Sequence, residues 1–221
     1  MMAFLEGVLS AADLTLVRDG LAQATWKDGK ATAGAAARSV KDNLQASGGD
    51  PHVQGLERFV LDALMRHPVF AIAARPARFS RVLFSRYEPG MTYGRHTDDA
   101  LMGPAGDQVR TDLAFTVFLA DPTAYEGGAL EIEGPAGDVS VKLAAGEAVV
   151  YPAGTIHRVA PVTAGARLAA VGWVQSLVAD ASQREVLFDL SRARAALSGN
   201  RDDALLIDKA ISNLLRMWAR P

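Results

Sequence analysis

The sequence contains no cysteine. This absence excludes disulfide frameworks, thiolate zinc sites, iron–sulfur clusters and cysteine nucleophiles together. Long apolar runs are missing too, because no stretch approaches the roughly 18 consecutive apolar residues that span a membrane. The opening residues MMAFLEGVLSAADL lack a basic segment followed by a long apolar run, so we expect no signal peptide. These absences favour a cytoplasmic enzyme with no membrane partner.

Charge of one sign is not in excess either. The chain has 23 lysines and arginines against 25 aspartates and glutamates, a formal net charge of −2. No basic block or basic stripe occurs, so nucleic acid is not an expected partner. With 221 residues, 49% of them apolar, the chain is long enough for one substantial domain with a sizeable core.

Residues 1–77 have a mostly helical pattern. Ser10 can cap a short helix that runs to about Gly20, and the alanine-rich stretch ATAGAAARSV at residues 31–40 favours another. Apolar residues recur at helical spacing from Val53 to Leu64. Proline disfavours the helical conformation in the residue before it, so Pro68 is expected to end that helix.

The pattern changes at about residue 78. From there to residue 178, short runs rich in valine, phenylalanine, threonine and tyrosine alternate with turns, as in FSRVLFSRY, LAFTVFLA and EAVVYPAG. Several short strands at this spacing are typical of a sandwich or barrel. Residues 179–221 return to two amphipathic helices. We therefore predict an α+β fold with a mainly β core, N-terminal helices that pack on it, and a C-terminal helical tail.

The tail helices carry large apolar residues that need a partner. They are Leu205, Leu206, Ile211, Leu214, Leu215 and Trp218. Packing into the core is the favoured use, and a homo-oligomer interface is the alternative.

Four histidines are present, and two of them lie beside prolines at the ends of a predicted helix. For His52 and His67 a surface or helix-capping role is the favoured interpretation. His96 differs, because it belongs to a His-x-Asp pair with Asp98. Side chains at i and i+2 of a strand point to the same face, so His96 and Asp98 can reach one metal ion. Parity points Asp99 to the opposite face, where it can hydrogen-bond in the loop that follows.

His157 is the third candidate ligand. It begins a strand after the apolar run and Pro-Ala-Gly turn of VVYPAGTIHRV. Two histidines and a carboxylate from separate strands make the facial triad that holds non-haem Fe(II) with open positions. The alternative is two unrelated histidines in a barrel.

Arg167 follows His157 in the stretch TAGARLAAVGWVQS. By the two-residue period of a strand, Arg167 shares a face with Ala169, Val171 and Trp173, and that face is expected to point inward. A buried guanidinium needs an anionic partner, and a ligand carboxylate held by two hydrogen bonds is a natural one. An internal ion pair, or a register shifted by one residue, is the alternative.

His96-x-Asp98, distal His157 and Arg167 together resemble the Fe(II)/2-oxoglutarate-dependent dioxygenases. The preceding segment RYEPGMTYGRHTDD is similar to the prolyl-4-hydroxylase-like branch. Longer stretches are similar to the PKHD-type hydroxylases: TAGAAARSVKDNLQ, FLADPTAYEGGALEIE, YPAGTIHRVAPVTAGARLAAVGWVQS and the tail with LFDL. The resemblance covers nearly the whole chain.

The resemblance implies a double-stranded β-helix, or jelly roll, with Fe(II) held by His96, Asp98 and His157. It also implies 2-oxoglutarate bound by Arg167 and O2 as the oxidant. Tyr87 is either a second contact of 2-oxoglutarate or a core tyrosine whose hydroxyl is satisfied within the protein. Tyr93 either lines the substrate entrance or packs beside it. Such enzymes couple the decarboxylation of 2-oxoglutarate to hydroxylation of a C–H bond, and ascorbate often supports them as a reductant.

Other functions are compatible with parts of this pattern. A cupin-like metal-binding β-barrel without oxygenase activity would leave Arg167 without a role. A zinc hydrolase would need a general base, and no glutamate adjoins the three ligands. A non-catalytic scaffold would use the tail helices for assembly.

The loop at residues 100–110 is a candidate lid. The substrate is a small molecule or a peptide, with an iron-acquisition compound as one hypothesis.

Overall fold

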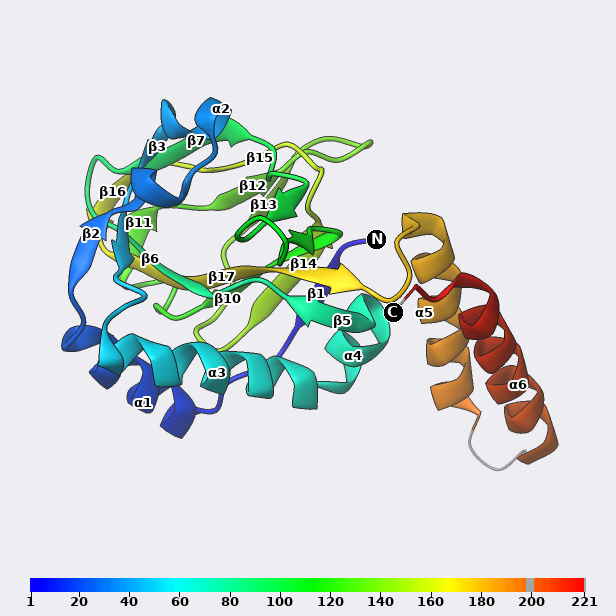
Figure 1. The fold of residues 1–221 in the computed structure, drawn as a ribbon. Coiled ribbons are helices and arrows are strands. Elements are labelled where there is room, and N and C mark those ends of the chain that lie inside the picture. The colour runs from blue at the N-terminus through cyan, green and yellow to red at the C-terminus, as the bar shows by residue number, and fades with distance from the viewer. Residues whose placement is uncertain (198–200, 221) are drawn as a thin grey trace.

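The computed structural model describes residues 1–197 and 201–220, without the side chains of residues 35 and 36. Two antiparallel sheets lie one above the other, and helices cover the outer face of the larger sheet (Figure 1). The larger sheet has the strand order β1–β14–β10–β17–β6–β4–β2, and β5 pairs with β17 beside this path. The smaller sheet has the order β13–β12–β15–β7–β3.

The elements have the following bounds. The larger sheet consists of β1 (Ala3–Leu5), β2 (Trp26–Asp28), β4 (Leu44–Ala46), β5 (Pro76–Phe79), β6 (Leu83–Tyr87), β10 (Leu113–Phe118), β14 (Ala148–Pro152) and β17 (Arg167–Ser176). The smaller sheet consists of β3 (Lys41–Asp42), β7 (Thr92–His96), β12 (Leu130–Ile132), β13 (Val139–Val141) and β15 (His157–Val159). Two ribbons pair β8 (Leu101–Met102) with β9 (Val109–Arg110) and β11 (Tyr125–Gly127) with β16 (Val162–Gly165). The helices are α1 (Ala11–Ala22), the short 3-10 helix η1 (Gly29–Thr32), α2 (Ala35–Arg38), α3 (Pro51–Arg66), α4 (Pro68–Ala74), α5 (Ala181–Ala196) and α6 (Arg201–Trp218).

The predicted mainly β core is confirmed, and its form is an open sandwich. Within the described residues no ladder joins the larger sheet to the smaller one, so the strands do not close into a barrel. The strand β10 is buried along its whole length, because helices cover one face of its sheet and the smaller sheet covers the other.

Two predicted helices form for the reasons expected. At the start of α1, Ser10 and Asp13 make a reciprocal capping box, with the Asp13 amide donating to Ser10 Oγ at 3.2 Å. At the start of α3, Asp50 accepts from the amide of His52 at 3.0 Å, and proline occupies the first turn. His67 ends α3 and its ring accepts from the amide of Phe70, so the expected capping role is confirmed. The helix ends before Pro68 as predicted, and Pro68 is also the first residue of the next helix, α4.

The prediction of a helix over residues 31–40 is wrong for most of that stretch. Only Ala35–Arg38 is helical, and Gly34 caps it without a side-chain hydrogen bond. A four-residue helix is marginal without such a cap. The chain then turns into β3 and β4, which extend both sheets, so residues 1–77 supply four strands as well as helices. Tertiary pairing here outweighs the helix propensity of alanine.

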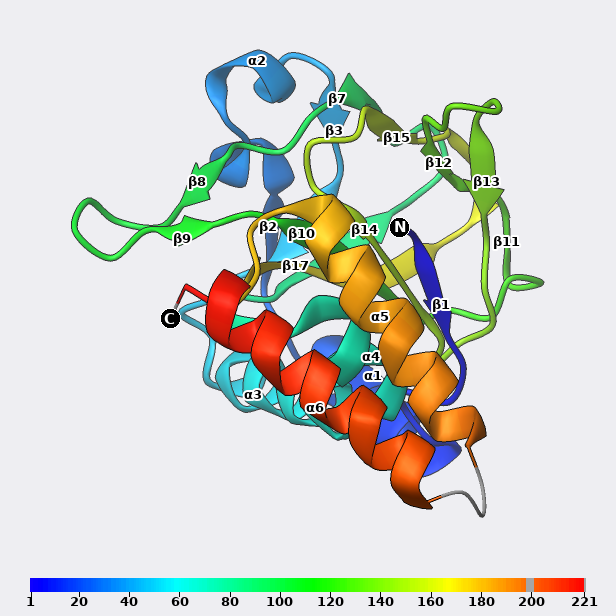
Figure 2. The same ribbon diagram turned by 90° about the vertical axis from the view of Figure 1, so that its right-hand side faces the viewer.

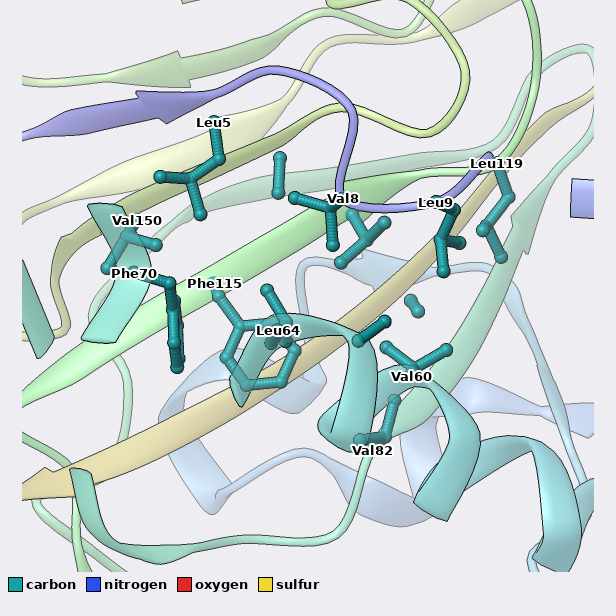
Figure 3. Close-up of a cluster of buried hydrophobic side chains, with 14 of the residues drawn as sticks. Leu5, Val8, Leu9, Val60, Leu64, Phe70, Val82, Phe115, Leu119 and Val150 are labelled. Carbon is teal, nitrogen blue, oxygen red and sulfur yellow. The ribbon is translucent and has the colours of Figure 1, made fainter. Parts of the chain in front are cut away.

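The main hydrophobic core lies between the larger sheet and helices α1, α3 and α4. Figure 3 shows Phe70 and Leu64 from the helical layer against Phe115 and Val150 from the sheet. Phe70 and Phe115 meet edge to face, with ring centroids 6.4 Å apart. A second cluster fills the space between the two sheets, and Tyr87 and Tyr151 belong to it. The larger sheet thus packs against the helices on one face and against the smaller sheet on the other.

The C-terminal helices α5 and α6 form a hairpin at the end of the larger sheet (Figure 2). Arg75 ties α5 to this sheet by donating to Ser191 Oγ at 2.9 Å, and Leu187 is fully buried. The expected core packing of α6 is wrong for Leu205 and Leu206, which are 63% and 62% exposed. In the described residues α6 lies beside α5 at the end of the sheet (Figure 2), and this packing leaves Leu205 and Leu206 on the exposed side. Within the described residues, no helix is long and apolar enough to cross a membrane.

Candidate active site

The smaller sheet brings the two predicted histidine ligands together. His96 is the last residue of β7 and His157 is the first residue of β15, and the two are direct partners across this antiparallel ladder. Their ring centroids are 4.3 Å apart. Asp98 follows just beyond the end of β7, and its Oδ1 lies 3.9 Å from His157 Nε2. Ligand atoms of all three residues lie within 4.8 Å of one another. The predicted triad therefore has the spacing of a metal site.

Backbone carbonyls orient both imidazole rings. His96 Nδ1 lies 2.8 Å from the carbonyl oxygen of Gly94, and His157 Nδ1 lies 2.9 Å from that of Thr155. A carbonyl can only accept, so each Nδ1 carries a proton, and Nε2 is the nitrogen of each ring that can bind a metal. In metal sites, such a hydrogen bond to the other ring nitrogen fixes the orientation of a histidine ligand.

The triad has donor atoms that lack partners within the protein. Asp98 Oδ2 is buried and makes no hydrogen bond within the described part of the chain. Burial raises the pKa of Asp98, and nearby His157 and Trp173 only partly offset that rise. Burial and the adjacent His157 lower the pKa of His96 to about 4, so its ring is neutral at pH 7. Two imidazoles that present Nε2 and one carboxylate with an unpartnered buried oxygen fit Fe(II), whose positive charge would compensate the buried anion.

Aromatic rings enclose the two histidines. The ring of Tyr93 stacks on His96, with centroids 3.6 Å apart and planes 19° apart. Tyr151 meets His157 edge-on at 5.2 Å. Tyr93 also lines the pocket that contains the triad, which is compatible with the predicted place at the substrate entrance.

Arg167 begins β17 and lines the same pocket. It is 1% exposed, and none of the carboxylates in residues 1–197 and 201–220 forms an ion pair with it. Its guanidinium lies over the rings of Tyr87 and Phe118, at 5.3 and 5.5 Å from their centroids, and its Nε has no hydrogen-bond partner. The inward orientation predicted from strand parity is correct, and the internal ion pair is not found in the described residues. A buried cation of this kind calls for an anionic ligand.

Two tyrosines accompany Arg167. Tyr87 is its direct partner in the β6–β17 ladder, and burial raises the pKa of Tyr87 to about 12, so its hydroxyl stays protonated and can donate. Tyr125 was not predicted, although it lies in the quoted stretch FLADPTAYEGGALEIE. Its hydroxyl is buried without a hydrogen-bond partner. Gly128 has φ +62°, and a Cβ there would lie 3.1 Å from Tyr125 and 3.2 Å from Arg167. The tight fit of these three residues requires glycine.

Sequence reasoning also missed a polar strand on the wall of the pocket. Lys41, Asn43 and Gln45 alternate along β3 and β4, and they are 5%, 2% and 5% exposed. Lys41 and Gln45 line the pocket. The signal was present as the period-two pattern K-x-N-x-Q, but the alanine-rich stretch before it favoured a helix.

Asp99 and the loop after it lie at the mouth. The carboxylate of Asp99 is so close to Gly34 that a Cβ there would lie 2.4 Å from Oδ2. The backbone oxygen of Asp99 accepts from Thr111 Oγ1 at 2.6 Å, which anchors the loop. Residues 101–110 form a projecting hairpin of β8 and β9 (Figure 2), and Met102 lines the pocket. Its action as a lid stays a prediction.

Comparisons with known proteins agree with this geometry. A profile of the 2OG-Fe(II) oxygenase superfamily matches residues 82–175. A PKHD-type hydroxylase of Acaryochloris marina is 48% identical over 222 aligned positions, which cover 99% of this chain and 100% of the relative. One of Maricaulis maris is also 48% identical, with 99% of each chain covered.

Solved structures share the fold at low identity. A prolyl-4-hydroxylase of Pseudomonas putida has a TM-score of 0.52 at 19% identity, covering 79% of this chain and 92% of the other. A 2OG-Fe(II) oxygenase family oxidoreductase of Burkholderia pseudomallei has a TM-score of 0.59 at 17% identity, covering 79% and 84%. The predicted double-stranded β-helix is thereby confirmed.

Fold and site thus define a 2OG-Fe(II) oxygenase. Within this superfamily, the chain belongs to the PKHD-type hydroxylases. It is an Fe(II)- and 2-oxoglutarate-dependent dioxygenase, and the cupin-like alternative without oxygenase activity is not supported.

Proposed function

We propose that His96, Asp98 and His157 hold the Fe(II) of this hydroxylase and that Arg167 and Tyr87 bind its 2-oxoglutarate. The observation that carries this assignment is the buried, unpaired guanidinium of Arg167 in the pocket that also contains the triad. A dicarboxylate that reaches from the triad to Arg167 would supply the missing anion. The orphaned Asp98 Oδ2 supports the metal half of the assignment in the same way.

Each residue then has a defined task. The Nε2 atoms of His96 and His157 donate lone pairs, and the Asp98 carboxylate contributes the negative charge of the ligand set. Arg167 binds the distal carboxylate of 2-oxoglutarate with two parallel N–H donors, and the protonated Tyr87 hydroxyl donates beside it. When bound, iron with 2-oxoglutarate and O2 supplies the oxidation, which yields succinate, CO2 and a hydroxylated C–H bond in the substrate. The three protein ligands leave room for that chemistry.

The apolar wall of the pocket would exclude water from the iron site. Trp173, Tyr93 and Tyr151 surround the metal ligands with apolar surface, so water is kept from the reacting centre. Tyr93 stands where substrate would enter. We propose a small molecule or a peptide as the substrate, a cytoplasmic location and ascorbate as the reductant that keeps the iron ferrous. The exposed Leu205 and Leu206 of α6 are the surface on which we propose that a homo-oligomer would form.

Succinate formation tests this proposal. Purified protein is incubated in air with Fe(II), ascorbate and 2-oxoglutarate, and succinate is measured by NMR. We expect slow substrate-independent formation of succinate that His96→Ala abolishes. The matched control His52→Ala, at the exposed start of α3, should retain it. Succinate formation that survives His96→Ala would rule out this ligand assignment.

A further inference from the structure

Lys41 is a buried cation for which the proposed chemistry has no task. It lies on β3 opposite Tyr93 of β7. The Lys41 ammonium is 5.1 Å from the Tyr93 ring centroid, and the same ring stacks on His96. Lys41 is 5% exposed and lines the pocket. An ammonium is normally found in solvent, so its presence here needs a reason.

The hydrogen bonding of Lys41 is incomplete. Its Nζ donates to Thr32 Oγ1 at 3.0 Å, and Thr32 in turn donates to Gln45 Oε1 at 2.6 Å. An ammonium has three donors, and among the described residues no carboxylate lies within ion-pair distance of Lys41. Asp98 and Asp28 are close enough to favour the charged form, while burial lowers the pKa of Lys41 to about 8. The side chain is therefore mostly protonated at pH 7.

When the charges of the pocket are added with Fe(II) and 2-oxoglutarate bound, the charge of Lys41 has no counterpart. Fe(II) brings two positive charges and 2-oxoglutarate two negative ones, and Arg167 balances Asp98. Once iron is bound through Nε2, with the proton on Nδ1, the two histidines add no charge. Lys41 then adds a positive charge, and the two other carboxylates near it, Asp28 and Asp99, are exposed to solvent and form no ion pair with it in the described residues. An uncompensated buried cation is costly, and an anionic ligand would remove that cost.

The two cations of the pocket lie at different places. Arg167 acts electrostatically on Tyr87, Tyr125 and Tyr151, at the inner end between the sheets. Lys41 acts on His96 and Asp98, and its partner Thr32 belongs to η1, beside the mouth. A dicarboxylate that is bound at Arg167 and at the metal leaves Lys41 free for a second ligand.

We propose that Lys41 binds a carboxylate group of the primary substrate and so places that substrate beside the iron ligands. The proposal rests on the proposed function, because it takes the triad and Arg167 as the sites of metal and cosubstrate. It makes the substrate a carboxylic acid, either a free acid or the C-terminus of a peptide. The ammonium supplies the free N–H donors, and Thr32 holds it in place.

The direct test observes the Lys41 ammonium itself. Protein with 15N-labelled lysine is loaded with Zn(II) and 2-oxoglutarate, and NMR follows the buried ammonium signal, assigned by its loss in Lys41→Arg. The probes are acetate, N-acetylglycine as a mimic of a peptide C-terminus, and the neutral acetamide. We expect acetate or N-acetylglycine to shift the Lys41 signal saturably, and acetamide to leave it unchanged. The more tightly binding acid identifies the source of the carboxylate.

The indole N–H of Trp173 gives a second reporter in the same pocket. Lys41→Met should weaken the acid's effect on it by about tenfold or more, the loss typical of a hydrogen bond to a charged group. Lys41→Arg should retain most of the affinity. Lys209→Met removes the same charge from exposed α6 and should change nothing.

Three results would overturn the proposal, and two of them concern the Lys41 signal. One is a Lys41 signal that neither acid shifts, and the other is an equal response to acetamide. A response of Trp173 that persists in Lys41→Met would place the acid on the metal instead. The visible charge-transfer band of the anaerobic Fe(II) protein with 2-oxoglutarate tests the iron and 2-oxoglutarate site independently of Lys41. If the band forms while Lys41 does not respond, only the Lys41 assignment fails.

Discussion

His157 lies directly opposite His96 across the ladder of β7 and β15. The chain separates these residues by 61 positions, yet the register of one short antiparallel pair sets their rings 4.3 Å apart. Asp98 needs only the turn after β7 to join them. The metal site therefore depends on strand pairing, and a change that shifts this register would dismantle it.

Removal of either histidine should abolish Fe(II) binding. His96→Ala and His157→Ala each leave two protein ligands, too few for the facial triad. Anaerobic calorimetry with Fe(II) measures the loss, and circular dichroism checks that the variants fold. His67 caps α4 and contacts the Glu6 carbonyl, and it does not line the pocket, so His67→Ala should bind iron like the wild type. Stoichiometric iron in His157→Ala would contradict the assignment.

Loss of the Arg167 charge should separate iron binding from 2-oxoglutarate binding. Arg167→Ala keeps the triad, so Fe(II) should still bind. Affinity for 2-oxoglutarate should fall by about 2–5 kcal/mol, since a buried carboxylate loses its charge-assisted partner. Calorimetry on the Zn(II)-loaded protein measures this difference. The control is Arg158→Ala, which removes an ion pair between Arg158 of β15 and Glu131 of β12. Normal 2-oxoglutarate affinity in Arg167→Ala would make our assignment wrong.

Tyr87 and Tyr125 should be distinguishable by their hydroxyl groups. Tyr87→Phe removes one donor beside Arg167 and should weaken 2-oxoglutarate by about 0.5–1.5 kcal/mol. The same titration of Tyr125→Phe shows whether its unpartnered hydroxyl also contacts the ligand. Unchanged affinity in Tyr87→Phe would mean that Tyr87 is a core tyrosine only.

Metal-free protein should lose stability as the pH falls below about 6.5, the pKa of an ordinary histidine. The pKa of His96 is lowered to about 4 in the folded protein, whereas the unfolded chain has an ordinary histidine with a pKa of about 6.5. Between these values the unfolded state binds more protons, so unfolding becomes easier on acidification. Urea unfolding at several pH values should show a smaller loss in His96→Gln. An identical pH dependence in both proteins would exclude His96 as the cause.

The alternation of side chains along strands predicted the direction of Arg167 correctly, whereas local sequence patterns did not predict the burial of Lys41 or the exposure of two leucines in α6. The inward direction of Arg167 followed from its face shared with Ala169 and Val171, and the structure agrees. The burial of Lys41 was missed because its two-residue strand pairs with β7, a contact 52 positions away that local pattern does not encode. Leu205 and Leu206 have a helical apolar period, but period alone does not say whether a second surface covers them.

The central claim is that the triad and Arg167 bind iron and 2-oxoglutarate together. Anaerobic visible absorption of the Fe(II) protein, titrated with 2-oxoglutarate, tests it most directly. We predict a weak metal-to-ligand charge-transfer band near the middle of the visible range, which saturates with 2-oxoglutarate and is lost in His157→Ala. Bound iron without this band, at any concentration of 2-oxoglutarate, would contradict the account.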